Sequence, residues 1–143
     1  MATRTASTTW DGDLAKGSGT TSVGTGAFGP VSVSWPRRTE DAQGTTSPEE
    51  LIAAAHASCY AMAFSNELAT AGATDIHLEV SAAVTIEVGA GGANITTSAL
   101  TVRGSVSGID DAAFRQAAEG AKSGCPVSKA LAGVEITLDA STT

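Results

Sequence analysis

An uncharged, alanine-rich segment in the middle of the chain constrains the fold more than any other feature. Residues 51–66 contain no Asp, Glu, Lys or Arg. Between Leu51 and Ala63 the apolar residues occur nearly all round a helix, which predicts a helix buried on all sides rather than lying on a surface. The run is too short to span a bilayer and contains polar residues such as His56 and Asn66, so it predicts a core helix.

Clear signals mark both ends of this helix. Ser47 is a good N-cap, Pro48 suits the first helical position, and Glu50 completes a capping box. Gly72 is the natural C-terminal stop. Nothing between Glu50 and Cys59 breaks a helix, since there is no Gly or Pro there.

The other segments predict an α+β fold in which antiparallel sheets pack on long central helices. The clearest strand is 76–88, where apolar and polar residues alternate. A glycine-rich hairpin connection at 89–94 leads into a return strand at 95–106. Further strands are predicted at 3–9, 18–23, 31–35 (stopped by Pro36) and 134–138, a polar loop at 37–46, and helices at 111–122 and 126–131.

Length and charge bound the function. At 143 residues the chain predicts a single domain, 1–143. A net charge of -7 argues against nucleic acid and against anionic membrane surfaces as partners. Residues 1–5 contain no apolar stretch, so no signal peptide is predicted and a cytoplasmic protein is expected.

The two cysteines are the candidates for chemistry. Cys59 lies inside the uncharged helix and Cys125 at the predicted start of another, and we expect both positions to favour a thiolate. In a reducing compartment such a pair is more typical of redox chemistry than of a permanent disulfide. The alternative is two structural cysteines packed as small hydrophobes.

Other reactive side chains have simpler interpretations. His56 precedes Cys59 by three residues and shares its helix face. A Cys–His nucleophile pair is one interpretation, and a core or interface histidine with satisfied hydrogen bonds is the favoured one. His77 is expected to be solvated. A zinc site built from the two Cys and two His lacks any close ligand pair apart from His56 and Cys59. Trp10 and Trp35 are expected to be core or interface aromatics.

Four blocks of sequence together resemble the OsmC/Ohr family, the osmotically inducible protein C and organic hydroperoxide resistance proteins. They are WDGD at 10–13, SPEELIAAAHASC at 47–59, GCPVS at 124–128 and EITL at 135–138. The resemblance runs nearly end to end, and the block containing His56 is more similar to the OsmC branch.

The resemblance implies a thiol peroxidase that reduces organic hydroperoxides without a cofactor or metal, as an intertwined homodimer. It implies that Cys59 is the peroxidatic cysteine and Cys125 the resolving one. Glu49 matches a glutamate that partners an arginine, for which Arg38 is the best match, with Arg37 adjacent. An external dithiol, a lipoyl group rather than glutathione or thioredoxin, would reduce the disulfide.

Two alternatives of other classes remain open at the level of sequence. One is a non-catalytic dimeric binding protein that keeps only the fold. The other is a redox sensor whose Cys59–Cys125 disulfide changes a partner interaction.

Overall fold

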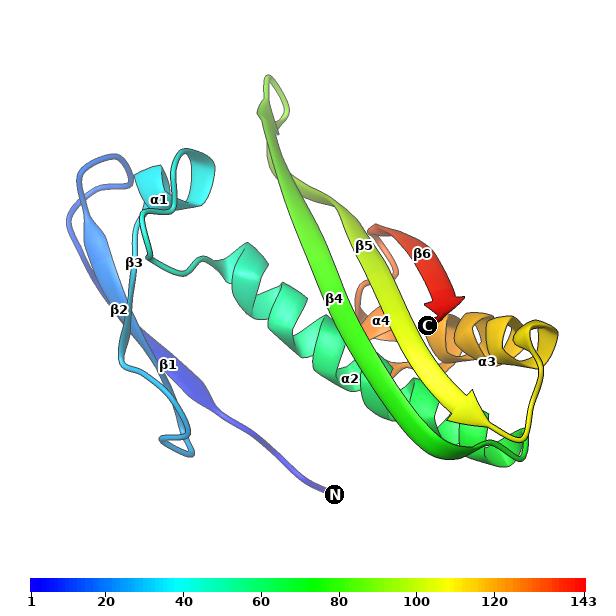
Figure 1. Ribbon diagram of the computed structural model, residues 1–143. Coiled ribbons are helices and arrows are strands. Elements are labelled where there is room, and N and C mark those ends of the chain that lie inside the picture. The colour runs from blue at the N-terminus through cyan, green and yellow to red at the C-terminus, as the bar shows by residue number, and fades with distance from the viewer. The chain divides into compact units, whose positions relative to one another are not determined.

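A computed structural model describes residues 1–143, and it divides into two compact units, Met1–Leu51 and Ile52–Thr143 (Figure 1). Each unit is described by itself. Both contain strands and helices, and the α+β class predicted from the sequence is confirmed.

The first unit contains a three-stranded antiparallel sheet of β1 (Ala6–Asp11), β2 (Ser18–Val23) and β3 (Val31–Val33) in that order. The strand predicted at 3–9 therefore begins and ends later than expected. Pro36 was expected only to stop a strand, but it lies in the first turn of helix α1 (Trp35–Thr39), which overlaps the end of the predicted strand and the start of the predicted loop. Proline fits there because its fixed φ suits a first turn whose N–H groups have no helical acceptor.

Helix α2 (Pro48–Thr70) confirms the predicted helix and its limits. The Ser47 hydroxyl accepts a hydrogen bond from the backbone N–H of Glu50 at 3.2 Å, and Gly72 follows the helix with φ at +95°. The expectation of burial on all sides is wrong for the single chain. Only one stripe at i, i+4 spacing is fully buried, which consists of His56, Tyr60, Phe64 and Leu68, whereas Met62 is exposed.

None of the helices combines the length and apolar character that crossing a bilayer requires.

The second unit contains a sheet of β4 (Thr74–Gly89), β5 (Gly92–Ser107) and β6 (Glu135–Thr142). Strands β4 and β5 form the predicted antiparallel hairpin. The expectation of antiparallel pairing fails for β6, which runs parallel to β5. The reason is the connection, because helices α3 (Asp111–Gly124) and α4 (Pro126–Ala130) together form a crossover that returns the chain in the same direction (Figure 1).

The core of the second unit lies where the buried stripe of α2 meets α3 and β5. The ring centroids of Phe64 and Phe114 are 5.0 Å apart in an edge-to-face arrangement. The Tyr60 hydroxyl donates to the carbonyl oxygen of Ala118 at 2.9 Å, so this buried polar group is satisfied. Cys125 belongs to the same core and is fully buried. Its surroundings are therefore fixed by packing.

Candidate functional site

Cys59 and Cys125 are free thiols that contact each other within the second unit. Cys59 is partly exposed on α2, next to the core residue Tyr60. Cys125 is the residue between the end of α3 and the start of α4, and it is fully buried. Because Pro126 begins α4 immediately, the backbone N–H groups of Val127 and Ser128 lie near the sulfur atoms. The dithiol pair predicted from the sequence is thus brought together.

The two thiols differ in acidity. Burial raises the pKa of Cys59, the hydrogen bond with Cys125 raises it further, and the Val127 N–H offsets only part of this. Burial also acts to raise the pKa of Cys125, but the Ser128 N–H, the Cys59 thiol and the Ser128 hydroxyl outweigh it, so the pKa of Cys125 is lowered. The expectation that both positions favour a thiolate therefore holds for Cys125 and is wrong for Cys59 in the single chain.

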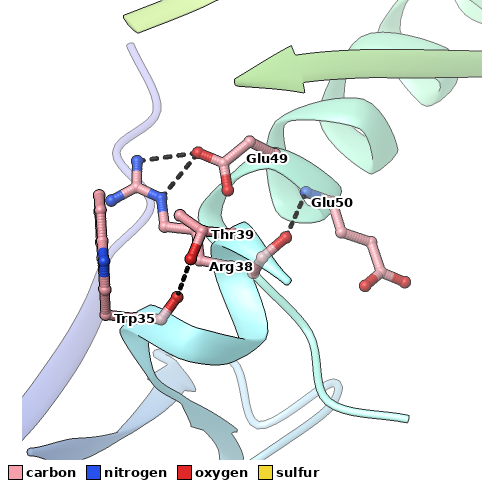
Figure 2. Close-up of polar contacts among 6 residues, drawn as sticks. Trp35, Arg38, Thr39, Glu49 and Glu50 are labelled. Carbon is pink, nitrogen blue, oxygen red and sulfur yellow. Dashed lines mark hydrogen bonds and ion pairs between the residues drawn. The ribbon is translucent and has the colours of Figure 1, made fainter. Parts of the chain in front are cut away.

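Arg38 and Glu49 form an ion pair within the first unit. Both Nε and Nη2 of Arg38 lie 2.8 Å from Oε1 of Glu49 (Figure 2). The guanidinium also lies 5.7 Å from the centre of the Trp35 ring, within cation–π range. Arg37, the other arginine considered from the sequence, donates instead to the carbonyl oxygen of Asp41 at 3.2 Å. The structure therefore pairs Glu49 with Arg38.

This ion pair leaves polar atoms without partners. Glu49 is only 5% exposed, and its Oε2 is buried and accepts no hydrogen bond. A guanidinium has five N–H groups, so those of Arg38 not bonded to Glu49 are free for another acceptor. An oriented cation with unused donors suits recognition of an anion or a developing negative charge.

Helix α2 carries both Glu49 and Cys59 and separates them. The helix is continuous over Pro48–Thr70, so ten residues correspond to about 15 Å along its axis. The two side chains also leave the helix in directions about 80° apart. The four predicted site residues therefore form two pairs, Cys59–Cys125 and Arg38–Glu49.

His56 joins the cysteine pair to two serines that the sequence did not single out. Its Nδ1 lies 2.7 Å from the Ser98 Oγ and its Nε2 lies 2.9 Å from the Ser128 Oγ. The expectation of a core histidine with satisfied hydrogen bonds is confirmed, because His56 is fully buried and both nitrogens are bonded. Burial lowers the pKa of His56, which favours the neutral imidazole. The serines come from β5 and α4, and no local spacing relates them to His56.

A small cavity of about 110 Å³ adjoins Arg38. Its lining is mostly apolar and consists of Trp10, Leu14, Val33, Ser34, Trp35, Arg38 and Pro48. Two larger hollows have volumes of about 520 and 560 Å³. Neither Arg38 nor either of the cysteines lines them. Of these three hollows, the cavity beside Arg38 combines a cation with apolar surface.

A family model and two curated relatives all match this chain to OsmC proteins. The family described as OsmC-like protein matches residues 40–139. The protein named peroxiredoxin OsmC of Escherichia coli (strain K12) is 42% identical over 130 residues, which cover 91% of this chain and 90% of that protein. The peroxiredoxin OsmC of Shigella flexneri matches equally well.

Solved structures agree on the fold. The crystal structure of the organic hydroperoxide resistance protein OhrB of Bacillus subtilis is similar with a TM-score of 0.74 and 26% identity, and the match covers 96% of this chain and 98% of that one. An OsmC-like protein of Vibrio cholerae gives a TM-score of 0.75 at 16% identity, over 99% and 100% of the two chains. The second likeness concerns the fold alone.

The burial of His56 predicts how stability depends on pH. The folded-state pKa lies below the ordinary value of 6.5, so the unfolded chain binds the proton more readily. The contribution of His56 is complete above pH 6.5 and is lost as pH falls below that value. The free energy of unfolding, measured by urea titration at about pH 7.5 and about pH 5.5, should fall more in the wild type than in His56→Gln. Equal losses in both proteins would contradict a neutral buried imidazole.

Proposed function

The chain belongs to the OsmC-like protein family, and we propose that this cysteine-based peroxidase reduces organic hydroperoxides through a Cys59 sulfenic acid and a Cys59–Cys125 disulfide. The observation that carries the proposal is the contact between two free thiols of unequal exposure. A peroxide can reach the partly exposed sulfur of Cys59, whereas Cys125 is enclosed by the core. Accessibility therefore favours Cys59 as the peroxidatic cysteine and Cys125 as the resolving one.

In the proposed first step the Cys59 thiolate attacks one oxygen of the peroxide. The O–O bond breaks, Cys59 becomes a sulfenic acid, and the other oxygen leaves as an alkoxide that takes up a proton to form an alcohol. A second thiol then displaces the hydroxide of the sulfenic acid, which leaves as water once it is protonated. An external dithiol reduces the disulfide, and the family resemblance favours a lipoyl dithiol.

Cys59 needs a cation to react as a thiolate at neutral pH, because burial and Cys125 raise its pKa in the single chain. A guanidinium next to the sulfur would reverse this shift, and it could also donate to the leaving oxygen. We propose Arg38 for this role, with Glu49 orienting its planar group.

The Arg38–Glu49 pair of one subunit would serve Cys59 of another. The length of α2 between Glu49 and Cys59 excludes the same-chain arrangement unless the helix breaks. The exposed α2 residues Ala54, Ala55 and Met62 give a small, largely apolar face that a second copy could cover. A two-fold homodimer would supply both sites at once.

The organic part of the substrate would occupy the cavity beside Arg38. The aromatic residues Tyr60 and Phe64 of α2 are fully buried in the core, so they offer no surface to a substrate. The apolar side chains around Arg38 supply that surface in the proposal. A cytoplasmic location remains a prediction from the sequence.

The two cysteines should differ in single-turnover chemistry. Cys59→Ser should abolish peroxide reduction, and Cys125→Ser should consume about one equivalent of peroxide and stop as a sulfenic acid. A dimedone-type label followed by mass spectrometry locates that acid. Labelling of Cys125 in the Cys59→Ser protein would show instead that Cys125 is the peroxidatic cysteine. Loss of two thiols without turnover, even with a lipoyl dithiol, would favour the redox-sensor alternative.

The enzyme should prefer apolar substrates. Burial of apolar surface contributes about 25 cal/mol per Å², so kcat/KM for cumene hydroperoxide should exceed that for hydrogen peroxide by about tenfold or more. Val33→Ser should narrow this ratio by about fivefold, because Val33 lines the cavity beside Arg38. Val31→Ser is the matched control on the same strand, since Val31 lines a different hollow. Equal kcat/KM values for both peroxides would count against the cavity beside Arg38 as the site of the organic group.

The shared site predicts complementation between inactive subunits. Cys59→Ser and Glu49→Ala should each be inactive or nearly so, and a heterodimer of the two contains one intact site. After verified subunit exchange, an equal mixture should recover about a quarter of wild-type activity. The negative control replaces Glu49→Ala with the double variant Cys59→Ser/Glu49→Ala, which cannot complement. If the first mixture also stays inactive, the site is not built from two subunits.

A further inference from the structure

His56 is a buried side chain that the proposed peroxidase cycle does not use. It makes two short hydrogen bonds, and its two partners are almost fully enclosed, with Ser98 at 0% and Ser128 at 6% exposure. The three residues come from three elements, β5, α2 and α4. Burying three polar side chains in an apolar core is costly unless each is bonded, and apolar residues could fill the same space without this cost. The arrangement therefore calls for a role other than packing.

Ser128 connects this cluster to the cysteines. It lies three residues after Cys125, in α4, and both its backbone N–H and its hydroxyl interact with the Cys125 thiol. A continuous chain of contacts thus runs from Ser98 through His56 and Ser128 to the sulfur of Cys125, and from there to Cys59.

A hydrogen bond donated by the Ser128 hydroxyl to the Cys125 sulfur requires one direction for the whole chain. A serine hydroxyl has a single proton, so Ser128 can donate to the Cys125 sulfur only when its oxygen accepts from Nε2–H of His56. In that tautomer Nδ1 carries no proton and accepts from the Ser98 hydroxyl. Each donor then meets an acceptor, and the last one is the sulfur.

We propose that His56, with Ser98 behind it, is a positioning residue that holds the Ser128 hydroxyl as a donor to the Cys125 thiolate during disulfide formation. The proposal deepens the proposed function, on which it rests. In this step the Cys125 sulfur attacks the Cys59 sulfur, an S–S bond forms and the S–O bond of the sulfenic acid breaks. Cys125 is oxidised and Cys59 reduced, and the leaving hydroxide combines with a proton equivalent to the one lost by Cys125 to form water.

Few titratable groups compete with this contact. Those that interact with Cys125 are Cys59 and Tyr60, both from α2. Burial, then Glu119 and Cys125, raises the pKa of Tyr60, so it stays neutral. The polar contacts of His56 are hydroxyl groups, so it has no carboxylate to stabilise an imidazolium. The neutral imidazole thus acts by orienting a hydroxyl rather than by taking up a full proton.

The test separates the two chemical steps. Reduced wild type and Ser128→Ala are mixed with one equivalent of cumene hydroperoxide, and sulfenic acid and disulfide are followed by quenching and mass spectrometry. A hydrogen bond to a charged group is lost in Ser128→Ala, so disulfide formation near neutral pH should slow by about tenfold or more. The difference should shrink at alkaline pH, where Cys125 ionises without help. The rate of sulfenic acid formation is the internal reference.

Three further variants complete the design. Ser128→Thr keeps the hydroxyl and should restore most of the rate, and His56→Gln should show the same pH-dependent loss as Ser128→Ala. Ser123→Ala is the matched control, because its exposed hydroxyl donates only to the Glu119 carbonyl oxygen. A loss that is equal at all pH values, or no loss in Ser128→Ala, overturns the proposal.

A readout without turnover distinguishes failure of this proposal from failure of the proposed function. In a Cys59→Ser background the ultraviolet absorbance of the thiolate reports Cys125 alone. Adding Ser128→Ala should raise the pKa of Cys125 by about one unit. An unchanged pKa overturns the positioning role even if the enzyme reduces peroxides. A raised pKa in a protein that forms no sulfenic acid supports the contact and refutes only the peroxidase cycle.

Discussion

Helix α2 holds Glu49 in its first turn and Cys59 near its middle, and a continuous helix of 23 residues cannot fold back to bring them together. Glu49 pairs with Arg38, whereas Cys59, whose pKa is raised by burial, is ten residues further along the helix. The same stiffness makes α2 a good scaffold, because its buried stripe fixes Cys59 against the core. The geometry of this helix is the reason why we propose a site assembled from two subunits.

The core of the second unit combines packing with chemistry. Edge-to-face aromatic contacts between Phe64 and Phe114 set the spacing of α2 and α3. Cys125 follows α3 directly, so this spacing also sets where its sulfur lies relative to Cys59. The polar cluster around His56 is embedded in the same region. Acidity at Cys125 therefore depends on hydrogen bonds that only correct packing provides.

The sequence predicted the elements with local signals well and the non-local arrangements poorly. Ser47 and Gly72 marked the limits of α2 because caps and stops act over a few residues. The parallel pairing of β6 depends on a crossover of two helices, which alternation in residues 134–138 cannot reveal.

The candidate site also divides into residues that the sequence identified and contacts that it could not reveal. The family blocks contained the two cysteines, Arg38 and Glu49, but not the partners of His56. Ser98 and Ser128 lie 42 and 72 residues after His56 along the chain, and serine is too common to stand out. The acidity of Cys59 was also misjudged, because burial and a neighbouring thiol are properties of tertiary structure.

The unequal exposure of the two sulfur atoms also sets the direction of regeneration. In the proposed disulfide an incoming dithiol meets Cys59 first, since Cys125 has no contact with solvent. Attack at Cys59 expels Cys125, and a thiol of lowered pKa is the better leaving group. In the proposed cycle the mixed disulfide with the reductant would therefore form on α2, and Cys125 would be released directly as the thiolate that the next cycle requires.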